Sequence, residues 1–156
     1  MEPINQNSTD ALDSVLQQLE PDEIDAYLDT YTDSLVHEEH PFSRYMRTLI
    51  REKGLTQREV FERADLSDRY GYRLLTQEKN TRQRDYILRL CFGAKLTLQE
   101  TQRALKLYGM SELYAKVPRD AVLMIAFNRE LYEIDAVNAL LADHDMPPLK
   151  SVSYVG

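Results

Sequence analysis

The chain has 156 residues, of which 43% are hydrophobic, so it is long enough to bury the core of one ordinary domain or of a small domain with helical extensions. Its single cysteine, Cys91, excludes a disulfide framework and suits a reducing compartment. The N-terminal residues lack the basic start and apolar run of a signal peptide, and no apolar run approaches the roughly 18 residues of a membrane span, so we expect a cytoplasmic protein that does not enter a membrane.

The net charge of −7 is divided unevenly along the chain. Residues 1–42 contain eleven acidic and no basic side chains, whereas residues 43–108 contain fifteen basic and eight acidic ones. Residues 109–156 are mildly acidic, with seven acidic and four basic side chains. A basic block that follows an acidic segment indicates a partner of high charge, such as a nucleic acid.

The acidic arm, residues 1–42, is expected to form two amphipathic helices. Apolar residues from Leu12 to Leu19 follow the i, i+3, i+4, i+7 spacing of one helical face. After Pro21, which suits a first helical turn, the same spacing continues from Ile24 to Leu35. Disordered acidic segments usually lack such a stripe, so these apolar faces need a partner, either the rest of this chain or another protein.

Helix starts are marked clearly in the basic block, residues 43–108. Capping boxes at Thr56–Glu59 and Thr97–Glu100 predict the first turns of two helices. Ser43 and Ser67 are the expected N-caps of two further helices.

Glycines mark the expected helix ends in the same block. Gly54, Gly93 and Gly109 each follow an apolar periodic segment, as a residue that ends a helix in the left-handed conformation does. Alternating β-branched runs and hairpin turns are absent from the sequence. The expected helices span residues 43–54, 56–64, 67–75, 82–93 and 97–109.

Residues 84–105 and 119–140 repeat one another at an offset of 35. The coinciding residues are Arg84 and Arg119, Asp85 and Asp120, Leu88 and Leu123, Phe92 and Phe127, Leu96 and Leu131, Ala104 and Ala139, and Leu105 and Leu140. The repeat reflects either the shared patterning of helical hairpins or a duplicated helix pair stacked as in helical repeat proteins. In both cases residues 118–143 should form a helical hairpin packed on the basic block. Its first helix contains "AVLMIAF", residues 121–127, which is apolar on every side and is expected to be deeply buried.

The basic block resembles the five-helix DNA-binding domain of the lambda-repressor-like (XRE/Cro) regulators. The stretches "IREKGLTQREVFERADLS", residues 50–67, and "EKNTRQRDYILRLCFGAKLTLQE", residues 78–100, carry the resemblance. That family shows a first helix ending in a Lys-Gly-Leu-Thr-Gln run, a short second helix, a Ser-started recognition helix and two closing helices. The resemblance implies a five-helix helix-turn-helix domain (43–110). Together with the patterning of the other segments, it predicts an all-α chain in which an acidic helical arm (1–42) precedes this domain and a C-terminal helical hairpin (111–148) and a tail (149–156) follow it.

The resemblance also implies DNA-binding residues. A helix laid in the major groove reads bases from its N-terminal residues, while neighbouring helix ends and loops hold phosphates. Gln57 matches the glutamine with which the family braces the recognition helix and touches DNA. The implied reading face comprises Asp68, Arg69, Tyr70 and Arg73. The loop after that helix, where the family holds the DNA backbone, comprises Lys79, Asn80 and Arg82.

Three residues depart from the family's pattern. Gly71 stands where members usually bury an aliphatic side chain, and within a helix it costs about 1 kcal/mol relative to Ala, so Tyr70 and Tyr72 are the candidates to fill the space. Gln77 replaces the glycine that usually ends the recognition helix. Asp68 would repel phosphates, but a carboxylate suits a helix N-terminus, where it either caps the helix or accepts a hydrogen bond from cytosine N4.

Other candidate sites are weak. His37 and His40 are spaced i, i+3 without further ligands, so we expect no metal. Cys91 lies on the apolar stripe of an expected helix and is interpreted as a core thiol. No Gly-rich phosphate loop, paired carboxylates or nucleophile–base set is recognisable. We therefore expect no cofactor and no enzymatic activity.

The favoured interpretation is a sequence-specific DNA-binding transcriptional regulator of the XRE type, with double-stranded DNA as its partner. The acidic arm would then regulate it, either by competing with DNA for the basic block or by docking a partner protein. Such proteins commonly form homodimers on paired half-sites, and the hairpin or the arm would supply the dimer surface. The alternative is a protein–protein interaction module on a helix-turn-helix scaffold with little DNA affinity. Asp68, Gly71, the overall acidity and the expected buried repeat hairpin favour that alternative, whereas the clustered arginines and Gln57 oppose it.

Overall fold

The computed structural model describes residues 9–31 and 40–152, and within these ranges the chain forms helices and no strands. The all-α class expected from the sequence is therefore confirmed. Two compact units, residues 1–39 and residues 40–156, divide the chain. None of the helices in the described ranges has the length and apolar character that a membrane span requires.

The first unit contains two short α-helices, α1 (Thr9–Leu16) and α2 (Ile24–Thr30), with a 3-10 turn at Pro21–Glu23 between them. Pro21 opens that turn, as its fixed φ favours. Leu35, the last residue of the expected apolar stripe, lies outside the described residues. Within this unit three large apolar side chains stay 48%, 55% and 46% exposed: Leu16, Ile24 and Leu28.

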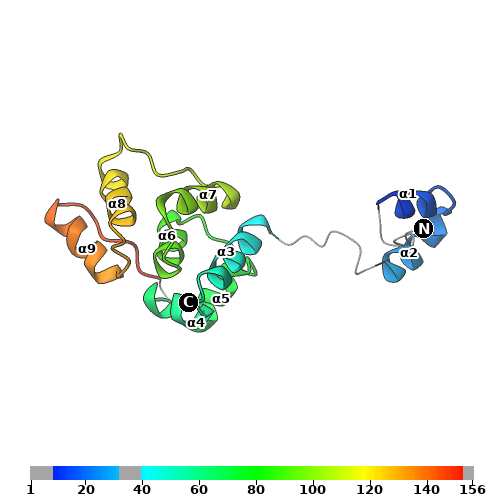
Figure 1. The fold of residues 1–156 in the computed structure, drawn as a ribbon, viewed down its shortest axis with the longest axis horizontal. Helices are drawn as coiled ribbons and strands as arrows, with labels where there is room; N and C mark the ends of the chain where they lie inside the picture. Colours follow the sequence, from blue (N-terminus) through cyan, green and yellow to red (C-terminus); the bar gives the residue numbers. More distant parts are fainter. Residues whose placement is uncertain (1–8, 32–39, 153–156) are drawn as a thin grey trace. The chain divides into compact units, whose positions relative to one another are not determined.

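The second unit is a bundle of α-helices arranged around α6 (Figure 1). Helices α3 to α5 lie on one side of α6, and α8 and α9 lie on the other (Figure 1). The bounds are α3 (Pro41–Glu52), α4 (Gln57–Arg63), α5 (Asp68–Leu75), α6 (Arg84–Gly93), α7 (Leu98–Tyr108), α8 (Pro118–Asn128) and α9 (Ile134–Asp143).

Three helices of this unit begin at the caps that the sequence predicts. The hydroxyls of Thr56 and Thr97 each accept a hydrogen bond from the third residue of their helix at 3.1 Å, and both capping boxes are complete. The hydroxyl of Ser67 accepts a hydrogen bond from the N–H of Tyr70 at 3.2 Å. These local signatures satisfy N–H groups that have no partner within the helix.

Ser43 is not an N-cap, contrary to the expectation. Helix α3 begins at Pro41, with His40 as its N-cap, and Ser43 is buried inside the first turn. Proline is favoured at the first helical position because its missing N–H would have no intrahelical partner there. That preference, rather than a serine cap, sets the start of α3.

Gly54 and Gly109 end their helices with φ of +68° and +87°, as expected, but Gly93 does not. Gly93 is the last residue inside α6, and a Cβ atom there would lie 2.3 Å from the carbonyl oxygen of Val60. The left-handed residue that ends α6 is Lys95, with φ of +54°. Gly93 is therefore required because α4 lies against α6 without room for a side chain.

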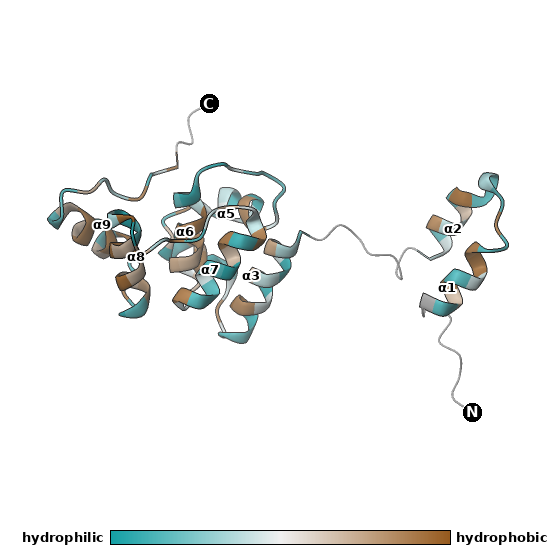
Figure 2. Ribbon diagram, turned by 90° about the horizontal axis from the view of Figure 1, so that it is seen from above, coloured by the Kyte–Doolittle hydropathy of each residue, from teal (hydrophilic) through white to brown (hydrophobic). Residues whose placement is uncertain are grey.

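Helix α6 forms the centre of the core. Eight of its ten residues are buried, namely Asp85 and every residue from Ile87 to Gly93, which include the charged Arg89. Its C-terminal half lies against α4, while Phe92 faces the C-terminal hairpin and stacks on Phe127 of α8. Brown, apolar positions also predominate along α8 and α9 (Figure 2).

Helix α8 is less buried than its sequence suggests. Leu123, Ala126 and Phe127 are at most 2% exposed, but Ile125 is 56% exposed. The expectation that this helix is deeply buried is therefore wrong for the face that carries Ile125. A helix at the edge of a bundle has neighbours on one side only, so one stripe of even an all-apolar helix faces outward.

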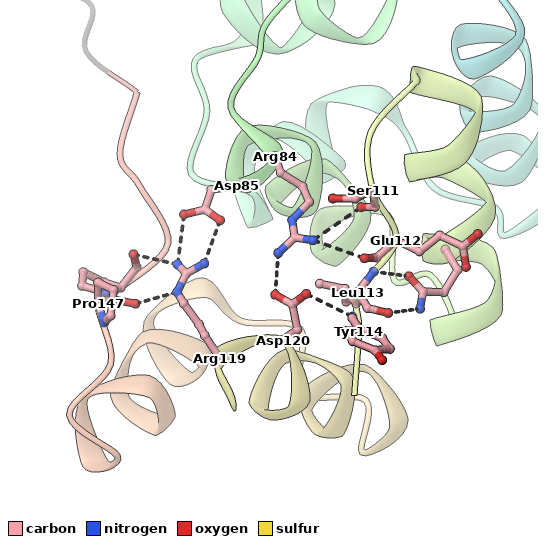
Figure 3. A network of polar contacts seen from close by, with 11 residues as sticks. Arg84, Asp85, Ser111, Glu112, Leu113, Tyr114, Arg119, Asp120 and Pro147 are labelled. Atoms are coloured by element: carbon pink, nitrogen blue, oxygen red, sulfur yellow. Dashed lines mark hydrogen bonds and ion pairs between the residues drawn. The ribbon is translucent and has the colours of Figure 1, made fainter. Parts of the chain in front are cut away.

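The repeated segments pair with each other across a local two-fold relation (Figure 3). Arg119 donates to both carboxylate oxygens of Asp85 at 3.0 Å, and Arg84 pairs with Asp120 in the reciprocal direction. Phe92 and Phe127, which are also equivalent by the offset, stack with ring centroids 3.9 Å apart and an interplanar angle of 8°. Reciprocal contacts between equivalent residues are the property of an isologous interface, whereas stacked repeats contact one another head to tail.

Local geometry also repeats at the ends of α6 and α8. Lys95 and Glu130 have φ of +54° and +55°, and each precedes a leucine whose N–H closes the helix end. Leu96 donates to the carbonyl of Cys91 at 3.1 Å, and Leu131 donates to that of Ala126 at 2.9 Å. These matches favour a duplicated helical hairpin. The equivalence weakens in the second helices, because Ala104 is fully buried and Ala139 is exposed.

Candidate nucleic-acid interface

Helices α4 and α5 meet at a tight turn made by residues 64–67. Asp65 takes the left-handed conformation with φ of +56°, and the N–H of Leu66 donates to the carbonyl of Phe61 at 2.9 Å. Leu66 is 6% exposed and anchors the turn in the core. Ser67 then caps α5, so the first turn of α5 starts directly at the surface.

Gly71 is the point of closest contact between the two helices. A Cβ atom at Gly71 would lie 2.5 Å from Cδ1 of Phe61, whose side chain is 3% exposed. The ring of Phe61 therefore fills the space left by the absent side chain. The expectation that Tyr70 and Tyr72 fill it is wrong, since Tyr72 is 46% exposed and Tyr70 packs toward Tyr86 instead.

The N-terminal turn of α5 exposes two of the predicted reading residues, Asp68 and Arg69. The carboxylate of Asp68 lies 3.9 Å from Nε of Arg58, near the start of α4, and their side chains are 65% and 80% exposed. Because Ser67 is the N-cap, Asp68 does not cap the helix with its own side chain. Its carboxylate is available to a cation or to a hydrogen-bond donor outside the chain.

Tyr70 is held within the domain rather than presented freely. Its ring meets that of Tyr86 edge to face, with centroids 6.2 Å apart and an interplanar angle of 89°. The ammonium of Lys79 lies 5.4 Å from the centroid of the Tyr70 ring. Tyr70 thereby connects α5, the following loop and α6, and Lys79 is placed over the same patch.

The loop after α5 is ordered by a residue that the sequence identified as a departure. Gln77 adopts the left-handed conformation that a glycine usually supplies, with φ of +58°. The N–H of Lys79 donates to the carbonyl of Arg73 at 3.0 Å, and the amide of Gln77 donates to Asn80 at 3.4 Å. Arg73 also lies 3.5 Å from Glu78, so its guanidinium is already paired with an acid.

The remaining predicted residues lie at the ends of helices or in loops. Gln57 is the first residue of α4 and is half-buried, and Arg82 is exposed just before α6. Sequence reasoning missed Arg58. The available signal was its position directly after Gln57 in the first turn of α4, where a side chain lies beside the start of α5.

Not all basic residues of the block are available to a partner. Arg89 is 2% exposed, and its guanidinium donates to the carbonyls of Ala64, Leu149 and Lys150 at 3.1, 3.0 and 2.7 Å. Arg84 is engaged by Asp120. These arginines therefore hold the fold, and the basic character available at the surface is smaller than the sequence count suggests.

The C-terminal segment, residues 147–151, is fastened to the bundle by polar contacts. Arg119 donates to the carbonyls of Pro147 and Pro148 at 3.1 and 3.0 Å (Figure 3). Asp85 accepts a hydrogen bond from the N–H of Lys150 at 3.0 Å. Burial raises the pKa of Asp85, but the hydrogen bonds from Arg119 and Lys150 and the nearby guanidinium charges outweigh it, so the pKa is lowered overall. Asp85 therefore stays ionised while the segment is bound.

The remaining candidates from the sequence are the thiol of Cys91 and the two histidines, His37 and His40. Cys91 is fully buried, and desolvation raises the pKa of its thiol to about 12, which fits a core thiol. His37 lies outside the described residues, and His40 is the N-cap of α3. Among residues 9–31 and 40–152 no group of three His, Cys, Asp or Glu side chains is placed to hold a metal ion.

A comparison of the chain with protein-family models, with curated proteins and with solved structures gives no match. A proposal for its function therefore rests on the residues and contacts of this chain.

Proposed function

We propose that residues 43–110 form a lambda-repressor-like helix-turn-helix domain and that the protein is a sequence-specific DNA-binding transcriptional regulator. The observation that carries the proposal is the juxtaposition of two helix N-termini at the surface. Asp68 and Arg69 begin α5, and Arg58 of α4 lies 3.9 Å from Asp68. A recognition helix reads base edges with such N-terminal residues.

We expect some of the surrounding residues to contact bases and others to contact phosphates. Arg69 is exposed on the first turn of α5, where a guanidinium can donate two hydrogen bonds to guanine. Lys79 and Arg82 are exposed in and after the loop, where sequence-independent contacts to phosphate are expected. Helix N-termini themselves favour phosphate because their N–H groups lack intrahelical partners. We expect Gln57, the first residue of α4, to make such a contact.

The negative charge of Asp68 repels phosphate, and this repulsion weakens DNA binding unless other contacts offset it. A carboxylate in the first turn of α5 stabilises the helix by interaction with the helix dipole. It also holds Arg58 near the start of α5. We expect Asp68 to act on DNA through its negative charge rather than by reading cytosine, so Asp68→Asn should tighten binding of all duplexes by a similar factor. A loss confined to sites with cytosine at one position would assign Asp68 to base reading instead.

The test is a salt titration of the full chain against a mixture of genomic duplex fragments. Binding should weaken steeply as salt rises, because displaced counterions accompany each phosphate contact. Arg69→Ala should relax base preference, whereas Arg82→Ala should weaken all sites alike and lower the salt slope by about 1. Arg129→Ala, which removes an exposed arginine beyond α8, is the control and should change neither property.

The alternative function is a protein-interaction module on a helix-turn-helix scaffold with little DNA affinity. The pairing of Arg58 with Asp68 and of Arg73 with Glu78 favours it, since acids already occupy two arginines of the surface. Exposed ion pairs of this kind contribute only about 0–1 kcal/mol, so DNA phosphate should displace the acids. Failure of the full chain to bind any duplex at low salt would sink the DNA-binding proposal and leave this alternative.

A further inference from the structure

The first unit, residues 1–39, has no core of its own among the residues that the structure describes. None of residues 10–31 is buried, and the apolar side chains of α1 and α2 are half-buried or exposed. The unit also contains no cysteine, so no disulfide can hold it together. Units below about 40 residues usually need a disulfide, a metal or a partner, because they bury too little apolar surface by themselves. The two helices therefore need apolar surface from outside the unit.

An open hollow of about 270 Å³ lies between α1 and α2. Its lining comes from the end of α1, the turn after it and α2, and comprises Leu16, Leu19, Glu20, Pro21, Ile24 and Tyr27. Apolar positions, brown in Figure 2, lie on both helices. We call these six residues the arm groove. Leu16 and Ile24 are about half exposed, so the groove presents apolar side chains to an occupant.

Local contacts define the bend that forms the arm groove. Pro21 opens the turn between the two helices, and the N–H of Glu20 donates to the carboxylate of Glu23 at 3.3 Å. At the far end of α2 the rings of Tyr27 and Tyr31 contact each other, with centroids 5.0 Å apart. The groove is therefore shaped before an occupant binds, which lowers the conformational entropy lost on binding.

The rim of the arm groove is acidic. Glu20 is itself a lining residue, and Asp13 lies one turn before Leu16 on α1. Residues 9–31 contain no basic side chain, and their acidic side chains are all exposed: Asp10, Asp13, Glu20, Asp22, Glu23, Asp25 and Asp29. An occupant must therefore match an apolar centre and a negative surround.

This combination selects among the possible occupants. A second copy of the arm would bring one acidic rim against another, and the phosphates of DNA or of an anionic lipid surface would be repelled in the same way. A helix with an apolar stripe flanked by Lys and Arg matches both the centre and the rim. Such a helix lays apolar side chains spaced i, i+3 and i+4 into a groove. As a third helix beside α1 and α2, it would give the unit the core that it lacks.

We propose that the arm groove binds a basic amphipathic helix of a partner protein, and that residues 9–31 are a docking module for it. The module lies outside α4 and α5, so the proposal does not depend on the proposed function, and failure of one leaves the other standing.

Calorimetric titration of the full chain with synthetic peptides tests the class of partner. The probe is a helical peptide of leucine and lysine whose leucines recur at i, i+3, i+4 and i+7. The comparison peptide has the same composition, with its leucines distributed around the helix. We expect the probe to bind about tenfold more tightly or better, because only the probe presents a continuous apolar face while the charge is the same.

Substitution of Leu16 and Ile24 by Gln tests the site. These changes keep the net charge and the helix propensity, and both side chains are exposed, so α1 and α2 should persist, as circular dichroism would verify. The pair should weaken binding of the probe about tenfold or more, as the loss of central apolar contacts does. The matched control is Ile125→Gln, which changes an equally exposed isoleucine of α8 and should leave the affinity unchanged.

A second pair of variants tests the rim. Asp13→Asn with Glu20→Gln should weaken binding of the probe at low salt and reduce its salt dependence. Glu133→Gln with Asp135→Asn changes the net charge equally at exposed positions of the hairpin and should have a smaller effect. Four results would overturn the proposal. They are no binding of the probe, equal affinity for the two peptides, an equal loss in Ile125→Gln, and a dimer of the parent chain in sedimentation equilibrium that Leu16→Gln with Ile24→Gln disrupts.

Discussion

At the scale of single residues, Gly71 and Phe61 depend on each other. Gly71 lacks the side chain that would collide with the Phe61 ring, and the ring supplies the apolar volume that Gly71 lacks. The glycine costs α5 about 1 kcal/mol of helix propensity, whereas overpacking a core typically costs about 1–3 kcal/mol. The second effect is the larger one here, because the contact would be with a buried ring and not with a flexible chain end.

Gly71→Ala is therefore expected to lower the free energy of unfolding by about 1 kcal/mol despite its gain in helix propensity. In a Phe61→Leu background, where the ring is gone, the same substitution should be neutral or stabilising. Denaturant unfolding of the four chains measures this coupling. Gly54→Ala is the control: it is strained by a φ of +68°, but no atom lies within 4 Å of its Cβ, so its effect should be the same in both backgrounds. Additive effects of Gly71→Ala and Phe61→Leu would contradict the proposed dependence.

At the scale of elements, two buried charged side chains of α6 bind other parts of the bundle. Arg89 binds the end of α4 and the C-terminal segment through three carbonyl oxygens, and Asp85 binds the same segment through the N–H of Lys150. Removing one partner of a buried charged contact costs more than the contact contributes, because the remaining groups lose their partners without regaining water.

Arg89→Met keeps much of the side-chain volume but leaves three buried carbonyls without their donor. We expect the free energy of unfolding to fall by about 3 kcal/mol or more. Arg129→Met, at an exposed position, should change it by no more than about 0.5 kcal/mol. Urea unfolding measures both variants. Equal changes in the free energy of unfolding would contradict a stabilising role of the Arg89 contacts.

The lowered pKa of Asp85 predicts a dependence of stability on pH. A carboxyl group whose pKa is lower in the folded chain contributes stability above its ordinary pKa of about 4, and this contribution is lost as pH falls through the lower folded value. Asp85→Asn should therefore be less stable at neutral pH, and it should lose less stability than the parent chain below about pH 4. Burial raises the pKa of Glu100, but its hydrogen bonds with Thr97 and Lys53 lower the pKa overall, so we expect Glu100 to account for part of the stability that Asp85→Asn still loses. Urea unfolding from pH 7 to about pH 2 provides the measurement, and an unchanged acid profile in Asp85→Asn would refute the assignment.

At the scale of the whole molecule, charge is separated along the chain. Every acidic side chain among residues 9–31 that the structure describes is exposed, and no basic residue of that range neutralises it. Because the arm is tethered, its carboxylates are present at a high local concentration, and they can compete with DNA for any surface of the chain that binds phosphate. The proposed DNA-binding function therefore predicts that the acidic arm lowers affinity for DNA.

Substituting Asp22, Asp25 and Asp29 by Asn removes three charges from the arm without shortening the chain. We expect tighter DNA binding at low salt and a smaller difference at high salt, where screening weakens the competition. The matched control substitutes Glu130, Glu133 and Asp135 by Gln, Gln and Asn, which changes the net charge equally at the C-terminal hairpin. Equal gains in the two variants would indicate an effect of net charge alone, and no gain in either would contradict competition by the arm.

Features that depend on local chemistry could be predicted from the sequence alone. The all-α class, the caps at Thr56, Ser67 and Thr97 and the left-handed glycines at 54 and 109 all follow from contacts within a few residues. The start of α3 at Pro41 is also a local feature, and predicting Ser43 as the N-cap placed the start of that helix wrongly.

Features that join residues far apart in the chain became visible only in the packing of the helices. Three contacts depend on which helix faces meet. The Phe61 ring covers Gly71, the backbone of α4 lies against Gly93, and the two Arg-Asp dipeptides of the repeat form reciprocal ion pairs. Periodicity identifies an apolar face but not the neighbour that covers it, and so α8 appeared buried although Ile125 faces outward. For the candidate interface, position along the chain identified α5, and the pairing of Arg58 with Asp68 appeared only when the two helices were brought together.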